Sequence, residues 1–115
     1  MAITEAFAGS EAVGATEWSL TTDTSGPDTE TSDGVFQIWL DLSDMVAGDQ
    51  LQVRIYEKVQ AADTQRVCHE AVLAGAQSTP IYVIPSLILM NGWDATLKAL
   101  AGTSITVTWS IRKVA

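Results

Sequence analysis

Apolar and polar residues alternate strictly along three segments of this chain, residues 35–42, 50–59 and 104–114. Successive side chains of a β-strand point to opposite faces, so this period of two is typical of strands with one buried face. The alternation assigns the following residues to inner faces: Phe36, Ile38, Leu40, Leu42, Leu51, Val53, Ile55, Glu57, Val59, Ile105, Val107, Trp109 and Ile111. In the second segment Gln52, Arg54, Tyr56 and Lys58 are expected to be solvated. Three strands are therefore predicted, each with a defined inner side.

Weaker alternation predicts three more strands, over residues 13–22, 65–74 and 81–90. Proline cannot donate a ladder hydrogen bond, so Pro85 predicts that the last of these is an edge strand or contains a β-bulge. Residues 1–8 are expected to be either an arm or an edge strand. Turn-forming residues separate the segments at Gly9–Ser10, Gly26–Pro27, Asp33–Gly34, Gly48–Asp49, Gly75, Asn91–Gly92 and Gly102.

Residues 94–102 (DATLKALAG) fit two structures. Asp94 is a suitable N-cap and Gly102 a suitable C′ residue for a helix. Alternating apolar residues, from Trp93 to Ala99, fit a strand equally well. We favour the strand, because every neighbouring segment is a predicted strand and the connections are short.

A weak internal repeat has a spacing of 54 residues and the pattern W-x8-G-x2-[LI]-x-V. Its two copies begin at Trp39 and Trp93. One interpretation is a pair of related hairpins packed face to face. The other is that any two hairpins of similar length share turn glycines and alternating apolar residues.

Strands that recur about every ten to fifteen residues, with turn residues between them, are typical of an all-β fold. We therefore expect one domain over residues 1–115, an antiparallel sandwich of seven or eight strands that is jelly-roll-like or Ig-like. A folded chain of 12.3 kDa buries roughly two thirds of its surface, so a core can form without disulfides or metal.

Charge is distributed unevenly along the chain. The net charge is −8, all six basic residues follow position 53, and ten of the fourteen acids lie in the first fifty residues. Binding to nucleic acid or to an anionic membrane requires a basic patch, so we expect neither partner. No apolar run approaches the roughly 20 residues that cross a bilayer, and the first residues lack the pattern of a signal peptide. An acidic surface suits docking onto a basic protein partner.

The residues that usually carry catalysis are scarce. Cys68 and His69 are the single cysteine and histidine, and adjacent residues of a strand point to opposite faces, so they cannot form a dyad. We expect Cys68 to be a small packing residue and His69 to be partly buried and hydrogen-bonded to a neighbour. The chain is predicted not to be an enzyme.

No cofactor or metal is predicted either. One cysteine and one histidine are too few for a structural zinc site. The segment 23–34 holds four carboxylates, from Asp23, Asp28, Glu30 and Asp33, but lacks the spacing of a calcium-binding loop. We expect it to be an exposed, mobile and solvated loop.

Four tryptophans divide into two groups. Trp93 and Trp109 share faces with apolar neighbours and are expected in the core. Trp39 alternates with Gln37 and Asp41 on a polar face, so it is a candidate for exposure, as is Trp18. Exposed aromatic residues mark either a partner surface or a second packed layer.

The runs ATEWSL at 15–20, GVFQIWLDLSDMVAGDQLQVRIYEKV at 34–59 and PSLILMNGWDATLKALAGTSITVTWSIRKVA at 85–115 resemble small virion proteins of tailed bacteriophages. The nearest functional type is the capsid decoration or cement protein. The resemblance implies a small, acidic, β-rich domain that forms dimers or trimers on the outer capsid surface and bridges subunits of the major capsid protein. It supplies no site motif.

This resemblance leads to a function based on surface contact. We expect a non-enzymatic virion protein, made in the host cytoplasm, that decorates and stabilises the outer capsid surface as a homodimer or homotrimer. The alternatives are a carbohydrate-binding or adhesion module and a head–tail connector or tail subunit. The predicted partner-interface residues are Ile3 and Phe7, which are large apolar residues near the N-terminus, together with Trp39.

Overall fold

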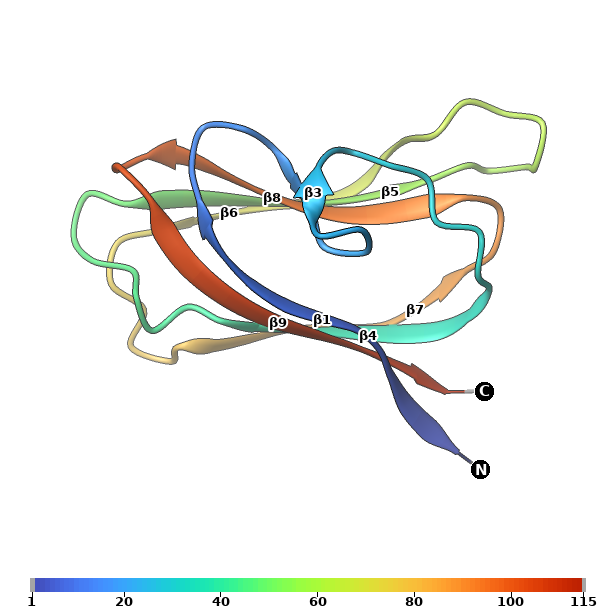
Figure 1. Cartoon of the computed structure of the whole chain (residues 1–115), viewed down its shortest axis with the longest axis horizontal. Coiled ribbons are helices and arrows are strands. Elements are labelled where there is room, and N and C mark those ends of the chain that lie inside the picture. The colour runs from blue at the N-terminus through green and yellow to red at the C-terminus, as the bar shows by residue number, and fades with distance from the viewer. Residues whose placement is uncertain (1, 115) are drawn as a thin grey trace.

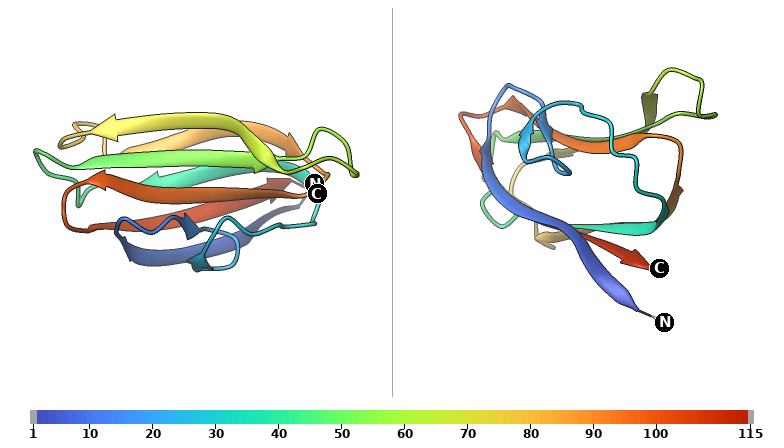
Figure 2. Two further views of the ribbon diagram at one scale, coloured as in Figure 1. Left: turned by 90° about the horizontal axis from the view of Figure 1, so that it is seen from above. Right: turned by 45° about the vertical axis from the view of Figure 1, so that its right-hand side comes forward.

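The computed structural model describes residues 2–114, which form nine strands in two antiparallel sheets and contain no helix. The strands are β1 (Ile3–Val13), β2 (Trp18–Ser19), β3 (Thr24–Ser25), β4 (Gly34–Asp41), β5 (Gln50–Glu57), β6 (Arg66–Ala74), β7 (Ile81–Leu89), β8 (Trp93–Ala101) and β9 (Ile105–Val114). A four-stranded sheet has the order β1-β9-β4-β7 and a five-stranded sheet the order β3-β2-β8-β5-β6. One sheet lies over the other (Figures 1 and 2). The predicted all-β sandwich is confirmed.

The strand order distinguishes between the two expected types of sandwich. The first and last strands, β1 and β9, are neighbours in one sheet, and β2 and β8 are neighbours in the other. This is the connectivity of a jelly roll. In an Ig-like sandwich the first two strands would share a sheet. The count exceeds the expected seven or eight because the two-residue strand β3 extends the five-stranded sheet beyond β2.

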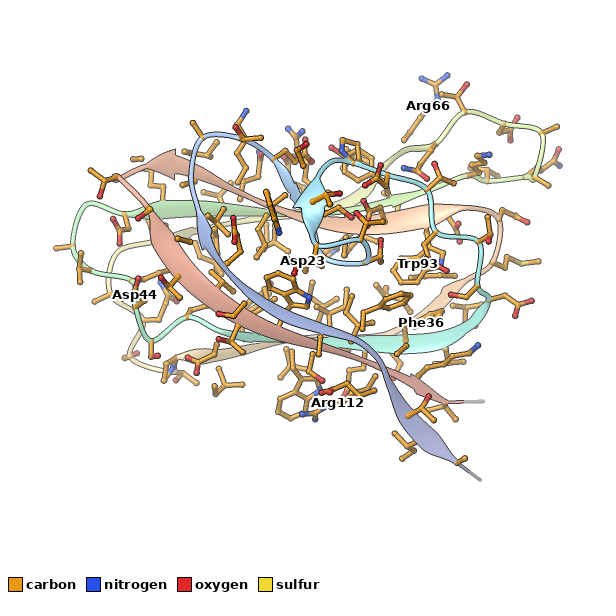
Figure 3. The ribbon with its side chains drawn as sticks, in the orientation of Figure 1. Asp23, Phe36, Asp44, Arg66, Trp93 and Arg112 are labelled. Atoms are coloured by element: carbon orange, nitrogen blue, oxygen red, sulfur yellow. The ribbon has the colours of Figure 1, made fainter. Side chains whose placement is uncertain are left out.

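The core lies between the sheets and contains the residues that the alternation assigned to buried faces, except at the end of the second segment. Val59 lies beyond β5 and is exposed, Glu57 is only half-buried, and Tyr56, expected to be solvated, is buried. Trp93 is its largest fully buried side chain, with the Phe36 ring centre 4.6 Å away and the Phe7 ring centre 5.9 Å away. Aromatic pairs at such separations stabilise a core beyond the area that they bury. Figure 3 shows Phe36 and Trp93 between the two sheets.

Residues 94–101 form strand β8, as favoured from the sequence. The strand predicted over residues 13–22 is confirmed only at Trp18–Ser19, which form β2, and its extent is wrong because Val13 belongs to β1 and the other residues are outside strands. The turn predicted at Gly9–Ser10 is also wrong. Gly9 lies within β1 opposite Trp109, where the indole ring leaves no room for a side chain.

The two copies of the sequence repeat are not hairpins. The chain crosses from the four-stranded to the five-stranded sheet between β4 and β5, and crosses back between β8 and β9. Strand β4 pairs with β9 and β5 pairs with β8, so the two crossing segments together form the centre of both sheets. The shared glycines, Gly48 and Gly102, have positive φ angles in these crossings.

Gly9→Ala is expected to lower the free energy of unfolding by about 1–3 kcal/mol, the usual cost of overpacking a core. A Cβ atom at Gly9 would lie 2.5 Å from Cζ2 of Trp109, so the indole would have to move. Gly14→Ala is the matched control, because a Cβ atom there meets nothing within 4 Å. Urea titrations measure the effect, and equal midpoints for the two variants would contradict the assigned contact.

Candidate interaction surface

The chain itself covers part of the outer face of the five-stranded sheet. In β8, Trp93, Ala95 and Leu97 point into the core, so Asp94 and Thr96 point outward, yet both are buried. The segment after β1 lies over them and supplies Ser19, Thr21 and the amide of Asp28 as hydrogen-bond donors. The acidic loop is therefore anchored to the sheet rather than wholly solvated, which corrects the expectation for residues 23–34.

Asp94 anchors the segment that covers this part of the sheet. Its Oδ1 accepts hydrogen bonds from the hydroxyls of Ser19 at 3.0 Å and Thr21 at 2.8 Å, and from the amide of Ala95 at 2.8 Å. Its Oδ2 accepts the amide of Asp28 at 2.7 Å. Burial raises the pKa of Asp94, and the four donors offset that rise in part.

A second carboxylate, that of Glu17, anchors the same covering segment to the sheet. The hydroxyls of Tyr56 and Thr96 each donate to Oε2 of Glu17 at 2.5 Å. Farther along this face Arg54 is paired to Glu70 at 2.9 Å, and Val72 is an exposed apolar side chain beside Gln52. Much of the outer face of the five-stranded sheet is thus occupied by the chain's own loop and by paired polar groups, with Val72 exposed on β6.

A β-bulge in β1 decides which side chains reach the opposite outer face, that of the four-stranded sheet. Glu5 pairs with Arg112 and Phe7 with Ile111, so Ala6 is an extra residue without a partner in β9. One extra residue reverses the side-chain alternation of a strand. Ile3 therefore points outward, whereas Phe7 points inward and packs edge-on against Trp93.

Four aliphatic residues form a continuous line across this face, one from each strand. Ile3 pairs with Val114, Val114 with Val35, and Val35 with Ile88. Directly opposed residues lie on the same face of a sheet, so the four side chains are neighbours. Ile3 is 70% exposed and Ile88 76% exposed. We call Ile3, Val114, Val35 and Ile88 the aliphatic row.

Beside the aliphatic row lies a stacked pair of large side chains. The Cζ atom of Arg112 lies 4.2 Å from the centre of the Trp39 ring, and Trp39 Nε1 donates to Gln37 Oε1 at 2.7 Å. A cation over an indole face is an attractive arrangement. Figure 3 shows Arg112 beyond the four-stranded sheet, on the side away from Phe36 and Trp93.

The structure brings Ile3 and Trp39, two of the three predicted interface residues, to one face, and places Phe7 in the core. Sequence reasoning missed Val35, Arg112 and Ile88. Val35 and Arg112 carried a usable signal, because each alternates with the buried residues of its own strand. Grouping them with Ile3 also requires the strand order, which the alternation does not contain.

The structure places Cys68 and His69 on the edge strand β6, where both are exposed. The expected packing of Cys68 and partial burial of His69 are therefore wrong, because this edge strand leaves both residues open to solvent. The Cys68 thiol donates to the carbonyl of Ile55 at 3.4 Å, and partial burial of its sulfur raises its pKa, which disfavours the reactive thiolate.

Three of the four carboxylates of the acidic loop, those of Asp23, Asp28 and Glu30, accept hydrogen bonds from neighbouring protein donors. Asp23 accepts the indole N–H of Trp18, and Asp28 accepts the hydroxyls of Thr22 and Thr24. Across residues 2–114 no three histidine, cysteine or acidic side chains are grouped so that they could hold a metal ion. The same residues include no helix that is long and apolar enough to span a membrane.

Comparison of the chain with models of protein families, with curated proteins and with solved structures gives no significant match.

Asp94→Ala is expected to lower the free energy of unfolding by about 2–4 kcal/mol, because it leaves buried donors of Ser19, Thr21 and Asp28 without an acceptor. Asp44→Ala is the matched control. It removes the same charge and a single exposed hydrogen bond, to the amide of Thr106. Urea unfolding gives the stability, and limited proteolysis reports whether residues 19–30 detach. Equal losses in both variants would contradict the anchoring role.

The stability difference between wild type and Asp94→Ala is expected to depend on pH. The folded state binds a proton at Asp94 more tightly than the unfolded state, whose pKa is near 3.8. Ionisation of Asp94 therefore lowers stability as the pH rises. The free energy of unfolding of the wild type is expected to exceed that of Asp94→Ala by a larger amount as the pH falls from about 7 to about 4. Urea unfolding at each pH measures this difference. A stability difference that becomes smaller as the pH falls over this range would contradict the raised pKa of Asp94.

Proposed function

We propose that this protein is a non-enzymatic structural component of a tailed-phage virion that binds the outer capsid surface and bridges capsid subunits. The contact surface in this proposal is the outer face of the four-stranded sheet. The observation that carries it is the aliphatic row, in which strongly exposed Ile3 and Ile88 continue through Val114 and Val35 across all four strands. Contiguous exposed apolar residues are typical of interaction sites.

The fold and the residue inventory support a role in contact rather than in chemistry. Jelly-roll sandwiches are common among viral capsid proteins, which is an argument by analogy of fold. The choice of a phage shell as partner rests on the resemblance of residues 15–20, 34–59 and 85–115 to small virion proteins.

The carbohydrate-binding alternative has less support from the geometry. An aromatic side chain that stacks on a sugar ring needs a free ring face. Arg112 lies over one face of Trp39, and the Trp18 indole packs against the core and donates to Asp23. A role as connector or tail subunit would use the same free sheet face, and differs in where in the virion the protein is found.

The proposal predicts that the chain is present in purified virions and that the purified protein binds shells of its phage assembled without it. Ile3→Ser with Ile88→Ser is expected to weaken this binding at least tenfold while the melting temperature stays near that of the wild type. Both side chains are already exposed in the free protein, so their removal affects only a surface that the partner would bury.

Val59→Ser is the matched control, because Val59 is 86% exposed and lies outside both sheets. It is expected to bind shells as the wild type does. Co-sedimentation with shells measures binding, and analytical ultracentrifugation of the same samples tests the predicted dimer or trimer. Absence of the chain from purified virions would overturn the virion proposal, and detection only in isolated tails would favour the tail alternative.

A further inference from the structure

The centre of the outer face holds a cation whose hydrogen-bonding capacity is mostly free. Arg112 lies over the Trp39 ring, with Cζ 4.2 Å from the ring centre. Its Nε donates weakly to Ser110 Oγ at 3.4 Å, and Ser110 in turn donates to Glu5 Oε2 at 2.6 Å. Among residues 2–114, none accepts a hydrogen bond from the Nη atoms of Arg112. The contact with the indole restrains the guanidinium group, which reduces the entropy lost when its donors bind.

The guanidinium forms one wall of a groove. The groove has a volume of about 350 Å³, and its lining includes Ile3, Val35, Val114, Gln37, Ser86 and Arg112. Ser86 reaches it because β7 contains an extra residue opposite β4, between the pairs Phe36–Leu87 and Ile38–Ile84. The lining therefore combines three aliphatic side chains with the charged donors of the Arg112 guanidinium.

We infer that this groove binds a segment of the partner protein in which a carboxylate lies next to an aliphatic side chain. The carboxylate binds the Nη donors of Arg112, and the aliphatic side chain packs against Ile3, Val35 and Val114. The inference rests on the proposed function and specifies the chemistry of the partner segment.

Charge complementarity supports this occupant. Arg112 is one of only six basic residues in a chain with fourteen acids, and it lies at the centre of the exposed face rather than among the paired groups of the other sheet. A guanidinium binds carboxylates through two parallel hydrogen bonds. Arginine and tryptophan are also the residues most enriched among those that dominate binding energy. The nearby acid, Glu5, is engaged by the Ser110 hydroxyl.

The test measures binding of Arg112 variants to shells assembled without this protein. Arg112→Ala is expected to weaken binding at least tenfold. The affinity of Arg112→Lys is expected to lie between those of Arg112→Ala and the wild type, because a lysine keeps the charge but loses the planar arrangement of donors. Arg112→Glu is expected to bind more weakly than Arg112→Ala, since it places two carboxylates together. Lys98→Ala, which removes a cation from β8 in the other sheet, is expected to bind as the wild type does.

Circular dichroism and thermal unfolding establish that each variant is folded, and Arg112→Lys keeps the test decisive if Arg112→Ala is unstable. Wild-type binding should also weaken with added salt, and less so for Arg112→Ala, since salt screens exposed charges. If wild type binds and Arg112→Ala binds equally well, the inference is wrong and the proposed function stands. If Arg112→Glu matches or exceeds Arg112→Ala, the group facing Arg112 is not a carboxylate and the inference is again wrong. If wild type does not bind shells, the proposed function itself fails.

Discussion

Every strand of a two-sheet sandwich has a side that cannot enter the core, and what covers that side decides where the molecule can make contacts. In the five-stranded sheet, buried Asp94 and Thr96 attach the chain's own loop to the outer side of β8. A buried carboxylate is tolerated only when several donors satisfy it, and Asp94 has four. Within residues 2–114, no comparable segment covers the aliphatic row of the four-stranded sheet. The asymmetry between the two faces follows from this one anchored loop.

The second determinant of the free face is a single extra residue. Without the bulge at Ala6, regular alternation from Phe7 would turn Ile3 toward the core side and Glu5 with it. The bulge lets one strand serve two purposes. Its regular part, from Phe7 to Val13, contributes to the core, and its first residues contribute Ile3 to the outer face. Gly9 allows the regular part of β1 to pack closely on the core, because the Trp109 ring lies against the Gly9 backbone.

Much of the fold was predictable where the signal is local. Alternation in the regular strand β4 identified both the buried Phe36 and the outward Trp39, and Pro85 correctly indicated an edge strand or a bulge in β7. Features set by distant partners were not predictable. The bulge at Ala6 depends on pairing with β9, and the jelly-roll order depends on which strands pair across the whole chain.

The same limit applies to single residues. Asp94 has the residue type and the sequence position of a helix N-cap. In the structure it lies in a strand, and its carboxylate accepts hydrogen bonds from the amide of Ala95 and from donors of a loop 66 or more residues earlier. Local sequence identifies a side chain that needs donors. It does not identify which donors the fold will supply. Candidate surface residues have the same property, since Val35 and Arg112 become neighbours of Ile3 only through the order of the strands.

The net charge of −8 and a local cation at the free face are compatible because they act over different distances. Screening in physiological salt has a length of about 8 Å. Packed sheets lie about 10 Å apart, so charges on the outer side of the five-stranded sheet act on a partner at the other face only beyond that length. The excess of acids then sets long-range repulsion between copies, whereas docking depends on what lies within one screening length of the partner. On the free face these groups are Arg112 against Trp39, the carboxylates of Glu5 and Asp41, and the aliphatic row, so the local arrangement of charges and apolar groups determines which segment can bind there.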